Sequence, residues 1–233
     1  MIAASPTYTY QASPLAANEL KVRHATYGKE PEVFTDIYNE ETNIVVWQRE
    51  LSNTLQDFVD NFLRSNPSFQ VAMTVTPQSV LSSLSESLGA SHHTDHQTEL
   101  IENIAELVDM FCCLFDLKRV GLRLTALDRA MCPKFHVDRV PCRLATTFQG
   151  IATEWLSHQR VNRDKLGSGS NGLPDHQSGL FKSQHDIQQL SCGDVALLKG
   201  ELWPKNENAG LVHRSPALLT GERRLLLTLD FSS

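Results

Sequence analysis

Residues 119–126, Arg-Val-Gly-Leu-Arg-Leu-Thr-Ala, mark a change of period in the chain. Val120, Leu122, Leu124 and Ala126 alternate with residues that are polar or lack an apolar side chain, the pattern of a β-strand with one buried face. More short strands are predicted after it, near 134–140, 142–149, 152–157, 186–190, 194–199, 210–214 and 223–231. Because no helical segments separate these strands, the pattern favours a sandwich or jelly roll over a parallel sheet with crossover helices.

Before this segment the period of the apolar residues is helical. A short β-branched strand at 43–47 precedes three amphipathic helices predicted near 51–66, 77–89 and 98–117. The first 40 or so residues are polar and aperiodic. The sequence therefore predicts an α+β protein with an extended arm at 1–42, a mainly helical N-terminal layer at 43–118 and a jelly-roll core at 119–233, the last two forming one compact unit.

Composition excludes several classes of protein. The 233 residues include 21 Lys+Arg and 27 Asp+Glu, a formal net charge of -6, so a nucleic-acid partner is not expected. The sequence has no uninterrupted apolar run of the roughly 20 residues that span a bilayer, and we expect no membrane partner. The N-terminus lacks the pattern of a secretory signal, so we expect a cytoplasmic protein.

The segment most informative about chemistry is 132–142, Cys-Pro-Lys-Phe-His-Val-Asp-Arg-Val-Pro-Cys. On a strand, His136 and Asp138 would point to the same face and present an imidazole beside a carboxylate. His213, on another predicted strand, could supply a third ligand. Two histidines and one carboxylate form the facial triad of non-haem Fe(II) oxygenases, which leaves coordination positions open for a 2-oxo acid and dioxygen.

An arginine near the end of the chain could hold the far carboxylate of the 2-oxo acid, because a guanidinium binds a carboxylate with two parallel hydrogen bonds. Arg223 and Arg224 both open the last predicted strand. Arg223 alternates in phase with the leucines of that strand, at 225, 227 and 229, so we expect it to point inward. Arg224 is the second candidate for this cofactor-binding role.

Four motifs carry a family resemblance: CPKFHVDRVPCR at 132–143, TEWL at 153–156, GDVALLKG at 193–200 and VHRSP at 212–216. They resemble an uncharacterised bacterial family, domain of unknown function 1826. The order of features is similar to the Fe(II)/2-oxoglutarate-dependent dioxygenases, especially the phytanoyl-CoA-hydroxylase-like branch. This resemblance implies a double-stranded β-helix that binds Fe(II) and 2-oxoglutarate and hydroxylates a small molecule or a protein side chain.

Other assignments stay open at the level of sequence. Arg143, Trp155 and Trp203 are candidates for substrate contacts, although a solvated strand residue and two core tryptophans would look the same. The segment at 159–182 is either a functional lid or disordered. His136 and Asp138 could also simply hydrogen-bond each other in a β core.

A non-catalytic zinc protein of metal homeostasis could use the same His136, Asp138 and His213 pocket, because these ligands also accept Zn(II). The family resemblance implies such a link to zinc-homeostasis proteins. The histidines of the 91–96 tract could assist, namely His92, His93 and His96. A Cys132–His136–Cys142 zinc site and a catalytically silent binding module are further alternatives.

Overall fold

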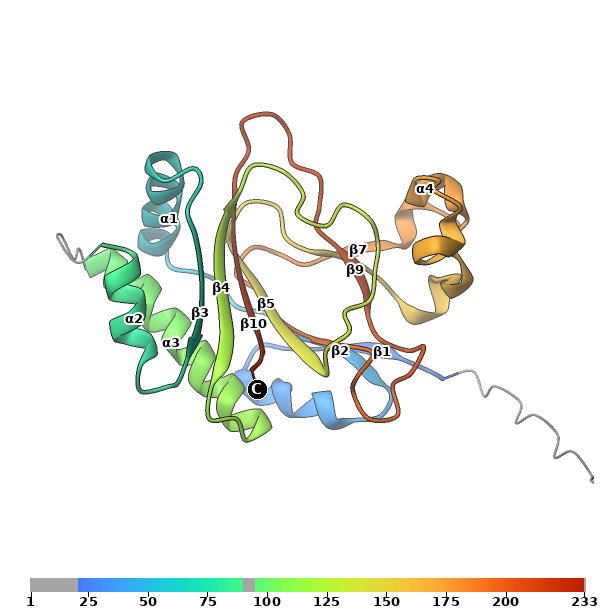
Figure 1. The fold of residues 1–233 in the computed structure, drawn as a ribbon, viewed down its shortest axis with the longest axis horizontal. Coiled ribbons are helices and arrows are strands. Elements are labelled where there is room, and N and C mark those ends of the chain that lie inside the picture. The colour runs from blue at the N-terminus through green and yellow to red at the C-terminus, as the bar shows by residue number, and fades with distance from the viewer. Residues whose placement is uncertain (1–20, 90–94, 233) are drawn as a thin grey trace, which may run out of the picture.

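The computed structural model describes residues 21–89 and 95–232, which form two β-sheets flanked by helices (Figure 1). The strands are β1 (His24–Gly28), β2 (Thr42–Trp47), β3 (Gln70–Val75), β4 (Val120–Leu127), β5 (Cys142–Gln149), β6 (Glu154–Leu156), β7 (Ile187–Gln189), β8 (Val195–Lys199), β9 (Val212–Arg214) and β10 (Arg224–Phe231). The helices are η1 (Pro31–Tyr38), α1 (Asn53–Ser65), α2 (Val80–Ser87), α3 (Asp95–Phe115) and α4 (Asp175–Ser178), with short 3-10 turns η3 (His158–Arg160), η4 (Arg163–Lys165), η5 (Gly167–Ser170) and η6 (Gln184–Asp186).

The large sheet has the order β1-β2-β8-β5-β10-β4-β3, and the small sheet has the order β7-β6-β9. From β4 onward the chain passes repeatedly between them: β4 and β5 lie in the large sheet, β6 and β7 in the small one, β8 in the large, β9 in the small and β10 in the large. Strand β10 pairs antiparallel with both β4 and β5. The C-terminal strand is therefore central to the large sheet.

The two faces of β10 have different surroundings. Leu225, Leu227 and Leu229 are fully buried in the main core, which also contains the apolar faces of α1, α2 and α3. Figure 1 shows these three helices on one side of the large sheet, with the small sheet and α4 on the other. Residues of the opposite phase, such as Arg224 and Asp230, face away from the helices because side chains alternate along a strand.

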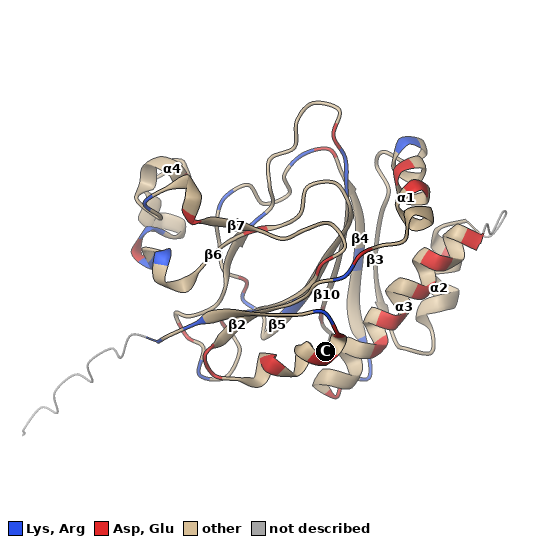
Figure 2. Cartoon of the chain, turned by 180° about the vertical axis from the view of Figure 1, so that it is seen from behind, with Lys and Arg blue, Asp and Glu red and all other residues tan. Residues whose placement is uncertain are grey.

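Helix α3 illustrates why the helices pack on this sheet. Leu100, Ile104, Leu107 and Phe111 recur at helical spacing and are 0–1% exposed. The helix also carries acidic residues and no lysine or arginine, and Figure 2 marks acidic positions in red along α2 and α3. Its apolar stripe is thus buried while its acidic face meets solvent. Within the described part of the chain, no helix has the length and apolar character needed to cross a bilayer.

Most of the expected elements are present, and β5 has the predicted bounds. The strand expected at 134–140 is absent except for an isolated bridge at His136. The strand β3, which was not predicted, is an edge strand whose residues are mostly exposed or half-buried, so it lacks a strong apolar signal. Helix α2 begins at Val80 and not at 77, because Thr76 and Ser79 form a hydrogen-bonded turn.

Part of the expected N-terminal arm is structured. Strand β1 pairs in parallel with β2, and the 3-10 helix η1 buries Phe34 and Ile37 in the main core. These two residues are spaced as in a single helical turn, a signal too short to be recognised in the sequence. Residues 1–20, which make up most of the rest of that arm, lie outside the described residues.

The segment at 159–182 folds into the turns η3, η4 and η5 and the short helix α4. It packs through Leu180, which is 1% exposed and lies in a small apolar cluster with Phe135, Leu156 and Val212. The cluster joins this segment to the small sheet, so the segment is an ordered part of the fold.

The aromatic contact between α3 and β10 predicts a large stability effect. Phe111 is 1% exposed and its ring lies 5.6 Å from that of Phe231. We expect Phe111→Ala to lower the free energy of unfolding by about 3–5 kcal/mol, because it leaves a cavity in the core. Denaturant unfolding measures this change. Leu219→Ala, at a position that is 73% exposed, should change it by less than about 0.5 kcal/mol, and equal effects would contradict this account of the core.

Candidate metal centre

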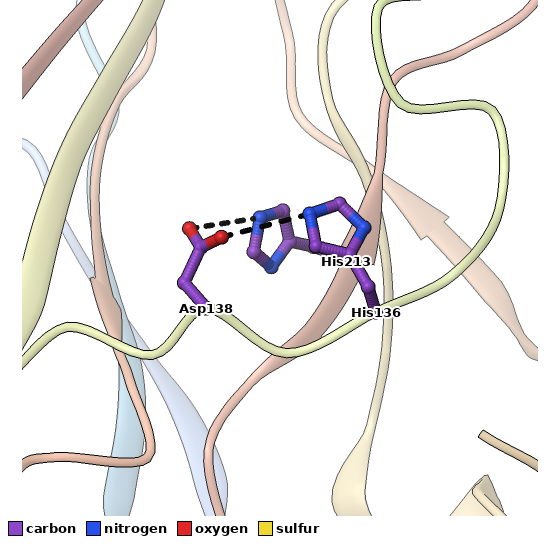
Figure 3. A group of neighbouring side chains, drawn as sticks. All are labelled: His136, Asp138 and His213. Carbon is purple, nitrogen blue, oxygen red and sulfur yellow. Dashed lines mark ion pairs between the residues drawn. The ribbon is translucent and has the colours of Figure 1, made fainter. Parts of the chain in front are cut away.

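Three potential metal ligands converge between the two sheets (Figure 3). His136 and Asp138 come from the loop between β4 and β5, and His213 comes from β9. The Nε2 atoms of His136 and His213 lie 3.6 and 3.4 Å from the two carboxylate oxygens of Asp138. One ligand atom from each residue lies within 4.8 Å of the others. The residues that the sequence predicted as a facial triad are therefore neighbours in space.

The backbone explains how a loop can position two of these ligands. His136 and His213 exchange two backbone hydrogen bonds, each of 3.0 Å, which fix the loop against β9. The Asp138 carbonyl accepts a hydrogen bond from the Glu201 amide at 3.0 Å. A Cβ atom at Gly200 would collide with the Val140 carbonyl oxygen and lie 2.9 Å from that of Asp138, so only glycine allows this close approach.

Both imidazoles are oriented by the same kind of contact. Nδ1 of His136 lies 3.0 Å from the Lys134 carbonyl oxygen, and Nδ1 of His213 lies 3.2 Å from that of Leu211. Because a carbonyl can only accept, Nδ1 must carry the proton, which leaves the lone pair of a neutral ring on Nε2. Such second contacts are typical of metal-binding histidines. Both Nε2 atoms are directed toward Asp138.

A partly buried ion-pair network supports the Asp138 carboxylate. Arg143 donates from Nη1 to Asp138 at 2.7 Å, and from Nε and Nη2 to Asp230 at 2.7 and 3.0 Å. Burial acts to raise the pKa of Asp138, but hydrogen bonds from His136 and His213 and the charge of Arg143 outweigh it and hold this pKa far below its usual range. The hydrogen bond with Asp138 raises the pKa of His136. Asp138 is thus held as a carboxylate.

The triad opens on a cavity between the sheets. Its lining includes His136, His213, Arg143, Arg214 and Thr153. The guanidinium of Arg143 is paired as described above, and that of Arg214 contacts Glu154 at 2.6 Å and Asp175 at 3.4 Å. Cavity-lining side chains therefore come from both sheets and from the loop that carries the triad.

The structure corrects the expected orientation of the two arginines. Arg223 lies before β10, is only partly buried and donates to the Pro67 carbonyl at 3.2 Å. Arg224 is fully buried and donates to the hydroxyls of Thr147 and Thr153 at 2.8–3.1 Å. The leucine-rich face of the last strand meets the helices and not the triad, so the inward arginine is in phase with the polar residues.

The other predicted site residues are dispersed. Trp155, on β6, is 4% exposed and lies in an apolar cluster between the two sheets, and Trp203 lies beside Tyr38 and Phe115. Arg143 does line the triad cavity. The sequence reasoning missed Asp230, although its shared phase with Arg224 along β10 could have revealed it.

The alternative zinc ligands are not gathered around His136. Cys132 is exposed and lines the triad cavity, whereas Cys142 is buried in the main core. His96 is exposed on α3, on the helical side of the large sheet. His92 and His93 lie outside the described residues. Within the described residues, the group that could hold a metal ion is His136, Asp138 and His213.

The Arg143–Asp230 contact predicts a change in metal affinity. In Asp230→Asn, Arg143 loses its bidentate carboxylate partner. The uncompensated charge of Arg143 then attracts the Asp138 carboxylate more strongly and repels any cation bound there. We expect the affinity for Co(II) to fall about tenfold, as when a group supporting a metal ligand is removed. Calorimetric titration measures this affinity. Asp57→Asn on α1 removes the same charge far from the triad and should leave the Co(II) affinity unchanged. Equal affinities in the wild type, Asp230→Asn and Asp57→Asn would show that Asp230 does not support the metal group.

Comparison with solved structures gives several similar folds. A dioxygenase for auxin oxidation from rice is 11% identical, with a TM-score of 0.49 and coverage of 90% of this chain and 82% of that one. T7H from Neurospora crassa, solved with alpha-KG and 5-formyluracil, is 10% identical, with a TM-score of 0.47 and coverage of 94% and 87%. A Pseudomonas putida prolyl-4-hydroxylase is 10% identical, with a TM-score of 0.44 and coverage of 86% and 97%.

Comparison with curated protein sequences gives no match. Comparison with protein families gives one match, which includes the triad, helices α1 to α3 and the strands from β2 onward. It matches residues 28–230, which is most of the chain. The chain therefore belongs to the family described as protein of unknown function (DUF1826).

Proposed function

We propose that this protein is an Fe(II)- and 2-oxoglutarate-dependent oxygenase that hydroxylates a small molecule or a protein side chain. The observation that carries the proposal is the joint arrangement of a facial His-Asp-His group and a buried arginine without a carboxylate partner. His136 and His213 line one cavity with Thr153, and the Thr153 hydroxyl accepts a hydrogen bond from Arg224, which lies directly behind this part of the wall.

The ligand set fits Fe(II). Two neutral imidazole nitrogens and one carboxylate are the ligands of mononuclear non-haem iron, and three protein ligands leave positions open. His136 and His213 would bind through Nε2 because their Nδ1 atoms are engaged with carbonyls. Iron held there would supply oxidation by dioxygen with 2-oxoglutarate as the co-substrate.

Arg224 fits the distal carboxylate of 2-oxoglutarate. Its Nη1 atom is buried and has no hydrogen-bond partner among residues 21–89 and 95–232, and burial lowers the pKa of the Arg224 guanidinium to about 10. Within the described residues no carboxylate lies within 4 Å of its guanidinium, although buried charges are normally paired. A carboxylate entering beside Thr153 would compensate this charge. Arg224, and not Arg223, is therefore the proposed anchor.

The remaining residues of the site would position these groups. Arg143 and Asp230 restrain the Asp138 carboxylate, and the two backbone bonds between His136 and His213 hold the imidazoles in place. The repeated passage of the chain between the two sheets supports the finer assignment of a double-stranded β-helix. The polar interior of this fold is where the chemistry would occur.

The test is an anaerobic titration of metal-free protein with Fe(II) and 2-oxoglutarate, followed by the visible metal-to-ligand charge-transfer band. We expect a band in the wild type and none in His136→Ala. In Arg224→Met the affinity for 2-oxoglutarate should fall at least about 30-fold, which corresponds to about 2 kcal/mol for the lost partner of a buried charge.

Arg223→Met is the matched control, because the neighbouring arginine lies outside the site, and it should bind 2-oxoglutarate like the wild type. Arg224→Met should still fold, since it replaces an unpaired buried charge by an apolar side chain of similar length. Absence of the band, together with stoichiometric Zn(II) binding that His136→Ala abolishes, would refute the oxygenase and favour zinc binding without turnover.

A further inference from the structure

A second cavity lies on the helical side of the large sheet, away from the triad. Leu198 lines the triad cavity, so the next residue of β8, Lys199, points to the opposite face. There Lys199, Arg23, Tyr38 and Trp203 line a cavity of about 170 Å³. An apolar cavity of about 150 Å³ accommodates a benzene molecule, so this one has room for a small ring with a polar substituent.

Two cations in this cavity are buried and have no counter-ion in the part of the chain that the structure describes. Arg23 is 3% and Lys199 is 1% exposed, and no carboxylate of the described residues lies within 4 Å of either one. Arg23 donates only to neutral acceptors, including Asn206 Oδ1 at 3.0 Å, and Lys199 donates to the Asn39 carbonyl at 2.9 Å. The exposed Glu40 also lines the cavity, outside ion-pair distance of both.

Burial and the neighbouring charge of Arg23 both disfavour the charged form of Lys199. Burial, followed by the charge of Arg23, lowers the pKa of Lys199 to about 8, against the smaller opposing effects of Cys142 and Glu40. Lys199 uses one of its three donors on Asn39 and so retains two. Since buried charges are normally paired, both cations lack the partner that an anion would supply.

Two aromatic rings also line the cavity, beside Pro204, Lys205 and Asn206. The Nζ atom of Lys199 lies 4.9 Å from the centre of the Trp203 ring, which lies 5.6 Å from that of Tyr38. Tyr38 is half exposed, yet its hydroxyl donates to the Leu114 carbonyl at 2.6 Å and fixes the ring. Preorganised aromatic surfaces next to a cation suit a ligand with a ring and a negative charge.

We propose that this cavity binds a small aromatic anion, with its phosphate or carboxylate group on Arg23 and Lys199 and its ring against Tyr38 and Trp203. The site is separate from the metal centre and does not depend on the oxygenase proposal. It also gives Trp203 a role as a ligand contact, at a place other than the triad.

The test uses full-length protein and the fluorescence of Trp203, titrated at constant ionic strength with phenyl phosphate, benzoate and neutral phenol. We expect saturable quenching by at least one of the two anions and none by phenol, with the signal lost in Trp203→Phe. Lys199→Met should weaken anion binding at least tenfold. Lys182→Met changes an exposed lysine after α4, away from this cavity, and should leave anion binding unchanged.

Two further measurements keep the result specific. His136→Ala should retain the quenching, because the metal centre is not involved; its loss would place the anion there and overturn the proposal. The anion should raise the unfolding temperature of the wild type but not that of Lys199→Met. If Lys199→Met does not fold, Arg23→Met is used in its place. An equal response to phenol, no saturable response to either anion, or an unchanged Lys199→Met would also overturn it.

Discussion

The structure depends on one strand having two different faces. β10 lies between β4 and β5, and its leucines are buried against the helices while Arg224 and Asp230 point toward the small sheet. A shift of one residue in register would exchange these faces and bury two charged groups among leucines. The register of β10 therefore specifies together the leucines of the main core on one side and the charged groups on the other, and it also determines which residues surround the triad.

This two-faced strand explains what the sequence could predict and what it could not. Alternation located β4, β5, β8 and β10 because each has a buried apolar face. Alternation alone could not show which face of β10 points toward the triad. The expectation that Arg223 points inward assumed that the leucine-rich face does so, and that assumption was wrong. In an isolated sheet the more apolar face marks the core, but in this fold the site side must accommodate a charged network.

The candidate metal group was predictable for a different reason. His136 and Asp138 were expected to share a face of a strand, yet their segment is a loop with a single bridge to His213. This single β-bridge is enough to bring the three ligands together. It aligns His136 with His213, and Asp138 follows only two residues after His136. Gly200, Arg143 and Asp230 support the metal group through contacts between segments that are far apart in the sequence. Local sequence patterns do not reveal such contacts.

Unpaired buried cations occur on both sides of the large sheet. Arg224 on the triad side and Lys199 with Arg23 on the helical side are each held by neutral oxygen acceptors. Neutral acceptors orient a cation without cancelling its charge, whereas Arg143 and Arg214, which contact carboxylates, are both oriented and compensated. An apolar side chain would fill the same space without the desolvation penalty. Charge at these positions does not serve the stability of the fold, which is why a ligand that completes the pairing is proposed at each of them.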